Sequence, residues 1–146
     1  MSKTIIALLT GMLITFIVDF FLFLGMKLNY FDFYEIEIFY NVLFADNQDF
    51  TLFFTSSIVF GFIVIFVANK KLTLTLISIL TIVSIAPLFS GVGESLGKEV
   101  FMKKDQTFNE AKHSFYGDIY YDGRRTIHFY DNELKRIIIL QKDKLK

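Results

Sequence analysis

The chain alternates long apolar stretches with short polar segments, and this pattern predicts membrane-spanning helices. The apolar stretches are residues 4–26, 50–68 and 72–92. The length of each matches the about 20 residues that a helix needs to cross the hydrocarbon core of a bilayer. Only residues 69–71 separate the second stretch from the third, so these two spans are expected to form a tight helical hairpin.

The last part of the chain has short segments, separated by turn residues, whose residue pattern is typical of β-strands. The expected strands cover residues 113–121, 124–130 and 135–141. Asp122-Gly123 lies between the first two and predicts a two-residue type I′ turn, which would place His128 opposite Gly117. A second turn is expected at 131–132. The predicted fold class is therefore a membrane α-helical protein with three transmembrane helices and a small C-terminal β-meander domain.

Two regions follow from this pattern. Residues 1–96 are expected to form the transmembrane domain, and residues 97–146 a small extramembrane β-rich domain. Residues 30–49 interleave aromatic and acidic side chains, and aromatic side chains concentrate at the membrane–water boundary. We therefore expect an interfacial loop there, with a short helix through 33–44. Pro87 and the glycines after it predict a kink or stop in the third span, followed by a flexible connection.

Small and weakly polar side chains recur at helical spacing in the predicted spans. Such residues let helix backbones approach closely, which is the main packing device within a bilayer. The residues expected to make these interhelical contacts are Ala7, Gly11, Thr15 and Asp19 in the first span, and Ser57 and Gly61 in the second. A row at every third residue of the third span consists of Thr75, Ser78, Thr81 and Ser84. Together these rows predict a compact three-helix bundle.

Asp19 lies inside the first apolar stretch. An ionisable side chain at bilayer depth is rare and usually faces a partner or a polar pathway. The favoured hypothesis is that a protonated carboxyl, or a hydrogen bond to a hydroxyl between the helices, fixes their register. The alternatives are pairing with a polar or basic residue of another subunit, and a proton or cation path. A path is the weaker alternative because the spans hold no second ionisable residue to relay a proton.

Two surfaces are expected to dock a partner. The first is the aromatic loop, through Tyr34, Phe39 and Tyr40. The second is the strand that contains Ile137, Ile138, Ile139 and Leu140. Four consecutive apolar residues in a strand must point to both faces of the sheet, and a three-stranded meander is too small to cover both by itself. The remaining face is expected to rest on the aromatic loop, on lipid or on another protein.

Composition narrows the chemistry further. The chain is 53% hydrophobic, has 19 Phe and carries a formal net charge of zero. The absence of cysteine excludes disulfides and thiol catalysis. Neither His113 nor His128 has the sequence spacing of a metal site. The sequence therefore predicts no catalytic residue, no cofactor, no metal and no nucleic-acid binding.

The positive charges of Lys3, Lys70 and Lys71 predict a cytoplasmic N-terminus and helical turn, with the C-terminal domain outside. The composition, rich in Phe, Ile and Lys, favours a bacterial inner membrane. The leading hypothesis for function is a non-enzymatic accessory, assembly or stabilising subunit of a larger membrane complex. Its expected partners are membrane lipid and a membrane protein or a second copy of the chain. The alternatives are a small transport or channel-like oligomer that uses Asp19, and an immunity or defence-type membrane protein.

Overall fold

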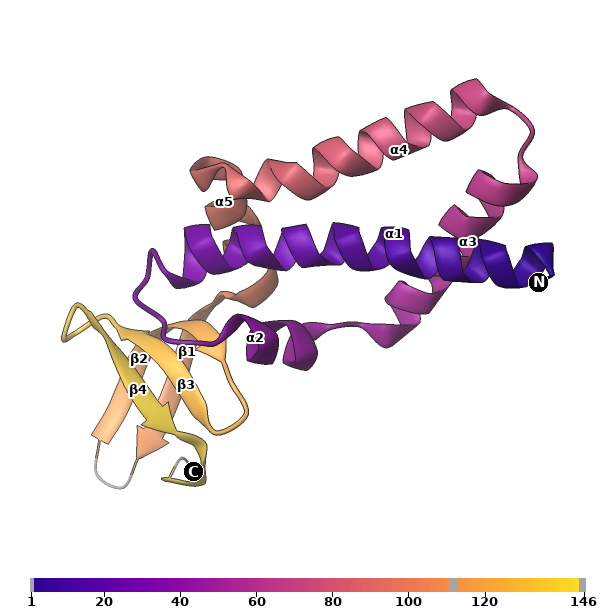
Figure 1. Ribbon diagram of the computed structural model, residues 1–146. Coiled ribbons are helices and arrows are strands. Elements are labelled where there is room, and N and C mark those ends of the chain that lie inside the picture. Colours follow the sequence, from indigo (N-terminus) through magenta and orange to yellow (C-terminus); the bar gives the residue numbers. More distant parts are fainter. Residues whose placement is uncertain (1, 111–112, 145–146) are drawn as a thin grey trace.

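The computed structural model describes residues 2–110 and 113–144. These residues form a long helical part with a small antiparallel sheet at one end (Figure 1). The elements are α1 (Lys3–Met26), α2 (Tyr40–Asn47), α3 (Phe50–Phe66), α4 (Lys70–Ile85), α5 (Ser90–Phe101), β1 (Lys103–Glu110), β2 (His113–Asp122), β3 (Thr126–Asp131) and β4 (Arg136–Gln141). Apolar helices joined to a small C-terminal antiparallel sheet, as the sequence predicts, are confirmed at that level.

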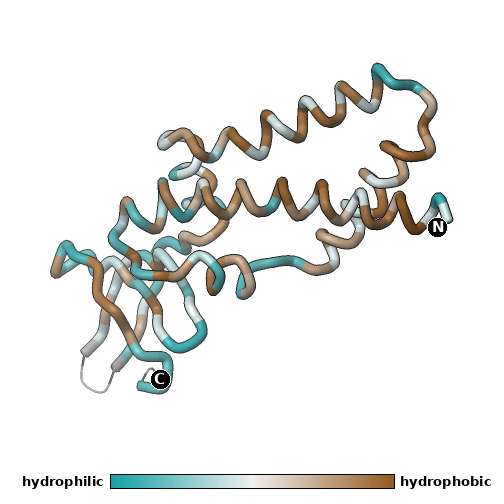
Figure 2. The backbone as a smooth tube through the Cα atoms, in the orientation of Figure 1, coloured by the Kyte–Doolittle hydropathy of each residue, from teal (hydrophilic) through white to brown (hydrophobic). Residues whose placement is uncertain are grey.

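Two helical segments among the described residues are long and apolar enough to cross a membrane, Lys3–Phe31 and Lys70–Leu88. The helices α2 and α3 pass the same test together, but they are bent by 84° at the break between them. The structure therefore offers two candidate spans, or three if the bent pair counts as one. Figure 2 shows hydrophobic residues dominating α1, α3 and α4, with hydrophilic residues at the α3–α4 turn.

The helix α1 is central, because α3 and α4 both pack on it and hardly on each other. The predicted compact three-helix bundle is therefore wrong. The row of small residues on α4 is also not buried as a unit, because Ser84 is buried while Thr75, Ser78 and Thr81 are exposed. The reason is geometric. Residues three apart on an α-helix are rotated by about 300°, so a row at this spacing shifts by roughly 60° per step. Over nine residues it passes to the opposite side of the helix, and no single neighbour can bury it.

The third apolar stretch is broken at Pro87. Here α4 ends, a short 3₁₀ turn follows at Ala86–Leu88, and α5 begins. The predicted stop is present, but the expected flexible connection is wrong, because α5 is a helix of 12 residues. Its glycines permit close packing: a Cβ atom on Gly93 would overlap the Pro87 carbonyl oxygen, and one on Gly97 would overlap the Tyr30 ring. The domain boundary drawn at residue 96 falls inside this helix.

The aromatic loop differs from its prediction in where its helix lies. A π-helical turn, Lys27–Phe31, extends α1, and residues 36–39 belong to neither helix nor strand before α2 begins. The predicted helix through 33–44 is therefore wrong in its first half. Glu35 has a φ of 55°, and this left-handed conformation ends the helical turn. Ile36 then turns inward and is buried.

The sheet has the strand order β1-β2-β3-β4 among the described residues, so its strands number four where the sequence predicts three. The additional strand is β1, which begins two residues after α5 ends. The β2–β3 turn also differs. The Gly123 amide donates to the Thr126 carbonyl oxygen at 3.0 Å, so Arg124 and Arg125 form the turn instead of Asp122-Gly123. Gly123 does not have the positive φ that a type I′ turn at 122–123 requires.

The pairing of β2 with β3 is shifted as a result. His128 lies opposite Tyr121, and Gly117 lies opposite Asp131, so the predicted pairing of His128 with Gly117 is wrong. The turn at Arg124-Arg125 is sufficient to explain the pairing of His128 with Tyr121. An extra residue at Tyr120 then shifts the pairings further from the turn by one. The second turn, predicted at 131–132, covers residues 132–135, because Asp131 still belongs to β3. The last strand, predicted at 135–141, runs from 136 to 141.

Within the part of the chain that the structure describes, two apolar clusters hold the fold together. One lies where the helices meet the sheet and combines residues from α1, the aromatic loop, α5 and β2. The other belongs to the sheet and contains Ile119, Ile127, Phe129 and Leu140. The sheet is thus joined to the helices through buried side chains.

Candidate functional site

The closest approach between helices lies where α1 crosses α3. A Cβ atom on Gly11 would overlap the Ser57 carbonyl oxygen, and one on Gly61 would overlap the Ala7 carbonyl oxygen. The Ser57 hydroxyl donates to the Phe53 carbonyl oxygen at 2.7 Å, within its own helix. Four of the residues expected at an interhelical contact therefore lie together, with backbone against backbone.

Asp19 lies further along α1, beside the linker between α2 and α3. Its Oδ2 accepts a hydrogen bond of 2.9 Å from Nε2 of Gln48, which is the residue directly after α2. The partner is thus an amide of the loop and not a hydroxyl between the helices. Because α3 begins two residues after Gln48, Asp19 is level with the N-terminal end of that helix and far from its middle.

A cleft of about 360 Å³ opens beside Asp19. Its walls come from α1, the α2–α3 linker, α3 and α5. The residues that line it are Thr15, Val18, Asp19, Leu22, Phe23, Met26, Asn47, Gln48, Asp49, Leu52, Phe53, Ser56, Phe60, Leu96 and Val100. Most of these are apolar, while Asp19 and residues 47–49 are polar. An apolar cleft with a few polar groups is the usual form of a small-molecule site.

Two polar atoms of this cleft's residues lack a hydrogen-bond partner in the part of the chain that the structure describes. They are Oγ1 of Thr15 and Oε1 of Gln48, and both are buried. Buried polar atoms are paired in the great majority of cases, so each exception calls for an explanation. Asp49, in contrast, is engaged, because its Oδ1 accepts from the Thr51 and Leu52 amides at 2.8 and 3.0 Å and caps α3.

The junction between helices and sheet is built from aromatic rings, which sequence reasoning assigned to a membrane interface. Phe31 packs edge-on against Phe101 of α5 and Tyr121 of β2, with ring centroids 5.0 and 5.2 Å apart. The Tyr30 hydroxyl donates to the Tyr120 carbonyl oxygen at 2.8 Å. The high density of aromatic residues in the loop is the sequence signal for a buried aromatic cluster, but it does not specify which other segment these residues contact.

Two of the three docking residues expected in the loop are engaged within the chain. The Tyr34 hydroxyl donates to Glu94 at 3.1 Å, and its ring lies 4.5 Å from the Tyr120 ring. The Tyr40 hydroxyl donates to the Phe20 carbonyl oxygen at 3.0 Å. Phe39 is different, because 81% of its surface is exposed.

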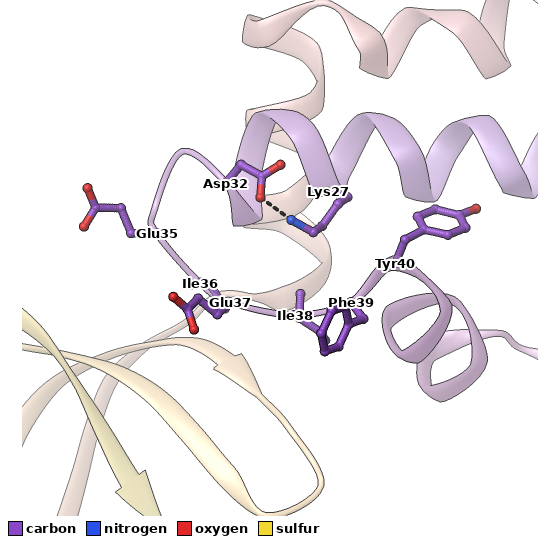
Figure 3. Close-up of a pocket in the computed structure, with 8 residues that line it drawn as sticks. All are labelled: Lys27, Asp32, Glu35, Ile36, Glu37, Ile38, Phe39 and Tyr40. Atoms are coloured by element: carbon purple, nitrogen blue, oxygen red, sulfur yellow. Dashed lines mark hydrogen bonds and ion pairs between the residues drawn. The ribbon is translucent and has the colours of Figure 1, made fainter.

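Phe39 lines a second hollow, of about 820 Å³, under the chain that leaves α1 (Figure 3). Lys27 and Asp32 form an ion pair on one side of this hollow, and Glu35 and Glu37 add carboxylates. Figure 3 shows Phe39 between Lys27 and the sheet, with Tyr40 lying beyond it at the start of α2.

The strand residues expected at a docking surface divide between the two faces of the sheet. Leu140 is buried, and Ile138 packs against the same cluster. Ile137 is half-buried, and Ile139 is 62% exposed. Ile139 pairs with His128, which the chain buries beside Tyr121. The face that carries Ile139 is thus covered only in part.

Charges around the sheet form two small networks. Asp122 accepts from Lys103 and Lys142, at 3.3 and 2.5 Å. Burial opposes the charge on Asp122, but these two lysines outweigh it and hold its pKa below the usual range.

Burial lowers the pKa of His128, while the charge of nearby Glu37 acts in the opposite direction. Arg124 forms an ion pair with Asp46, which joins the β2–β3 turn to α2.

Residues 2–110 and 113–144 contain no group of three or more His, Cys, Asp or Glu side chains that could hold a metal ion. No protein-family model, characterised protein or solved structure matches the chain. Its function is therefore inferred from the geometry and chemistry of its own residues.

Proposed function

We propose that this chain is a small integral membrane protein that serves as a non-enzymatic accessory subunit of a larger membrane complex. Insertion rests on the helical segments Lys3–Phe31 and Lys70–Leu88, which contain α1 and α4 and are long and apolar enough to span. These helices expose large apolar side chains over much of their length, including Leu13, Leu74 and Ile82 at 60–68%. In water such surface is costly to hydrate, whereas acyl chains cover it without cost.

The observation that carries the accessory role is the exposure of Phe39 and Ile139 outside the candidate spans. They are 81% and 62% exposed, although neither belongs to a helix that would lie in lipid. Ile139 pairs with His128, and Glu37 of the loop is close enough to affect that histidine. We therefore treat Phe39, Ile139 and the hollow lined by the loop as one docking surface for a membrane-protein partner. An aromatic side chain that a partner buries on binding often dominates the binding energy.

Co-purification in a mild detergent tests this role. A double variant, Phe39→Ser with Ile139→Thr, removes apolar contact from the surface and keeps the β-branched residue in the strand. We expect it to lose a partner that the unchanged chain retains in a fixed ratio. Leu134→Ser is the matched control, because Leu134 is 52% exposed in the β3–β4 turn. Equal retention by all three proteins would contradict the proposal.

The transport-like alternative has one observation in its favour, the cleft beside Asp19. A homogeneous oligomer of this chain alone, with cation or proton flux that Asp19→Asn abolishes, would favour it over the accessory role. The accessory role predicts that Asp19→Asn leaves any ion leak through reconstituted vesicles unchanged.

A further inference from the structure

We propose that the cleft beside Asp19 binds the primary ammonium group of a membrane lipid, with the lipid's apolar part along the cleft walls. This goes beyond the accessory role and requires that α1 and α3 both lie in a membrane. The hydrogen-bonding groups that remain free in the cleft determine the chemistry. The Asp19 carboxylate has one oxygen engaged by Gln48 and the other without a hydrogen bond in the described structure. Oε1 of Gln48 is buried and unpaired.

Both groups are hydrogen-bond acceptors. A carboxylate accepts only, and the amide oxygen of a glutamine does the same. The Thr15 hydroxyl, 97% buried and also unpaired, can accept or donate. A ligand that satisfies all three must therefore bring several N–H or O–H donors. A positive charge on the ligand adds attraction to Asp19, whereas a carboxylate or phosphate placed there would be repelled.

The other residues that line the cleft favour a ligand with an apolar part. Leu22, Phe23, Phe53, Phe60 and Val100 face the cleft, and its volume of about 360 Å³ falls in the range of small-ligand sites, roughly 300–1,000 Å³. The ligand is thus amphiphilic, with a cationic donor at one end. A protonated primary amine has three N–H donors, while a quaternary ammonium of the same charge has none.

The position of the cleft favours a lipid headgroup. Asp19 lies level with the first turn of α3, beside the polar linker at residues 47–49. If α1 and α3 cross the bilayer side by side, this level is close to the boundary of the hydrocarbon core, where headgroups begin. Leu96 and Val100 of α5 close the cleft on the side of the sheet, so acyl chains would extend along α1 towards the α3–α4 turn.

Phosphatidylethanolamine and phosphatidylcholine provide a matched pair of probes, because they differ in the N–H donors of the headgroup. The measurement is the melting temperature of the full chain in nanodiscs of each lipid. We expect the unchanged chain to melt about 2–4 °C higher in the ethanolamine lipid, the shift that about 1 kcal/mol of binding produces at this size. Asp19→Asn should abolish the difference. Asp143→Asn, an exposed aspartate after β4, removes the same charge elsewhere and should keep it.

A detergent experiment separates the cleft from the bilayer. Heptylamine, heptanol and heptanoate share one apolar chain and differ in the head, so only heptylamine should raise the melting temperature. Thr15→Val and Gln48→Leu, which leave Asp19 in place, should each weaken that response. Equal melting in both lipids, or equal stabilisation by heptanol, overturns the proposal. A chain that fails to enter nanodiscs would contradict the membrane location, and the lipid with it, while selectivity for heptylamine in detergent would still show an ammonium site.

Discussion

The Tyr30 hydroxyl donates a hydrogen bond of 2.8 Å to the backbone carbonyl oxygen of Tyr120. Tyr120 is the residue skipped where the pairing of β2 with β3 shifts register, between Ile119 and Tyr121. Tyr30 itself is fully buried on the π-helical extension of α1. A single side chain thus ties an irregularity of the sheet to the end of the central helix. Because the surrounding rings exclude water, this bond fixes how the sheet sits on the helices.

Tyr30→Phe should loosen this junction. The substitution retains the ring but removes the donor to the half-buried Tyr120 carbonyl oxygen, at a cost of about 1–3 kcal/mol. Tyr116→Phe is the control, because the Tyr116 hydroxyl bonds Asp105 at 2.9 Å on a side chain that is 48% exposed. Hydrogen exchange of β2 amides and thermal unfolding would measure both. An equal effect of the two variants would show that the buried bond has no special weight.

Gly11→Ala should weaken the α1–α3 contact. Alanine is the better helix former, by up to about 1 kcal/mol, but here its Cβ would overlap the Ser57 carbonyl oxygen. Forcing the backbones apart typically costs about 1–3 kcal/mol, so the net change should be destabilising. Gly91→Ala makes the same chemical change where a Cβ meets nothing within 4 Å, and it should be neutral or stabilising. Thermal unfolding in detergent compares the two, and equal shifts would contradict the close approach.

Acidification should destabilise the sheet through His128. Burial keeps its pKa below the usual value of about 6.5, so the unfolded chain takes up a proton more readily than the folded one. The folded state therefore loses stability as the pH falls from about 6.5 through the pKa of the folded state, and no such loss occurs at higher pH. His128→Gln should flatten the dependence between pH 7.5 and pH 5.5. Unchanged slopes would show that His128 is not the titrating group.

Cysteine labelling should place the two ends of the molecule on opposite sides of the membrane. The native chain has no cysteine, so single cysteines can be introduced at Lys70, the first residue of α4, and at Lys135, in the β3–β4 turn. Both positions are exposed. The positive-inside rule predicts that a membrane-impermeant reagent added to intact cells labels position 135 and not position 70. The reverse pattern would establish the inverted orientation, and labelling of both would contradict a spanning arrangement.

The sequence by itself determined the kinds of elements and most of their positions. Long apolar stretches predict helices, and the strands predicted at 113–121 and 135–141 from short segments between turn residues differ by one residue from β2 and β4. The break at Pro87 follows from a missing backbone donor. The small residues at positions 7, 11, 57 and 61 were likewise singled out by spacing alone, and they meet in the structure. The elements and the break at Pro87 depend on residues near one another in the chain, and so does the spacing of these small residues within each helix.

The tertiary structure decided the rest. Asp19 accepts a hydrogen bond from Gln48, which is 29 residues away in the sequence. Phe31 packs against Tyr121, which comes after α1 to α5 in the chain. The close packing of α5 also depends on a distant neighbour, because Gly97 lies against the Tyr30 ring. Propensity and periodicity describe which face of an element is apolar, but not which other element covers it. The packing of the whole chain makes that choice. It depends on contacts that a shift of an ångström or less would change, such as a glycine against a carbonyl oxygen or one ring against another.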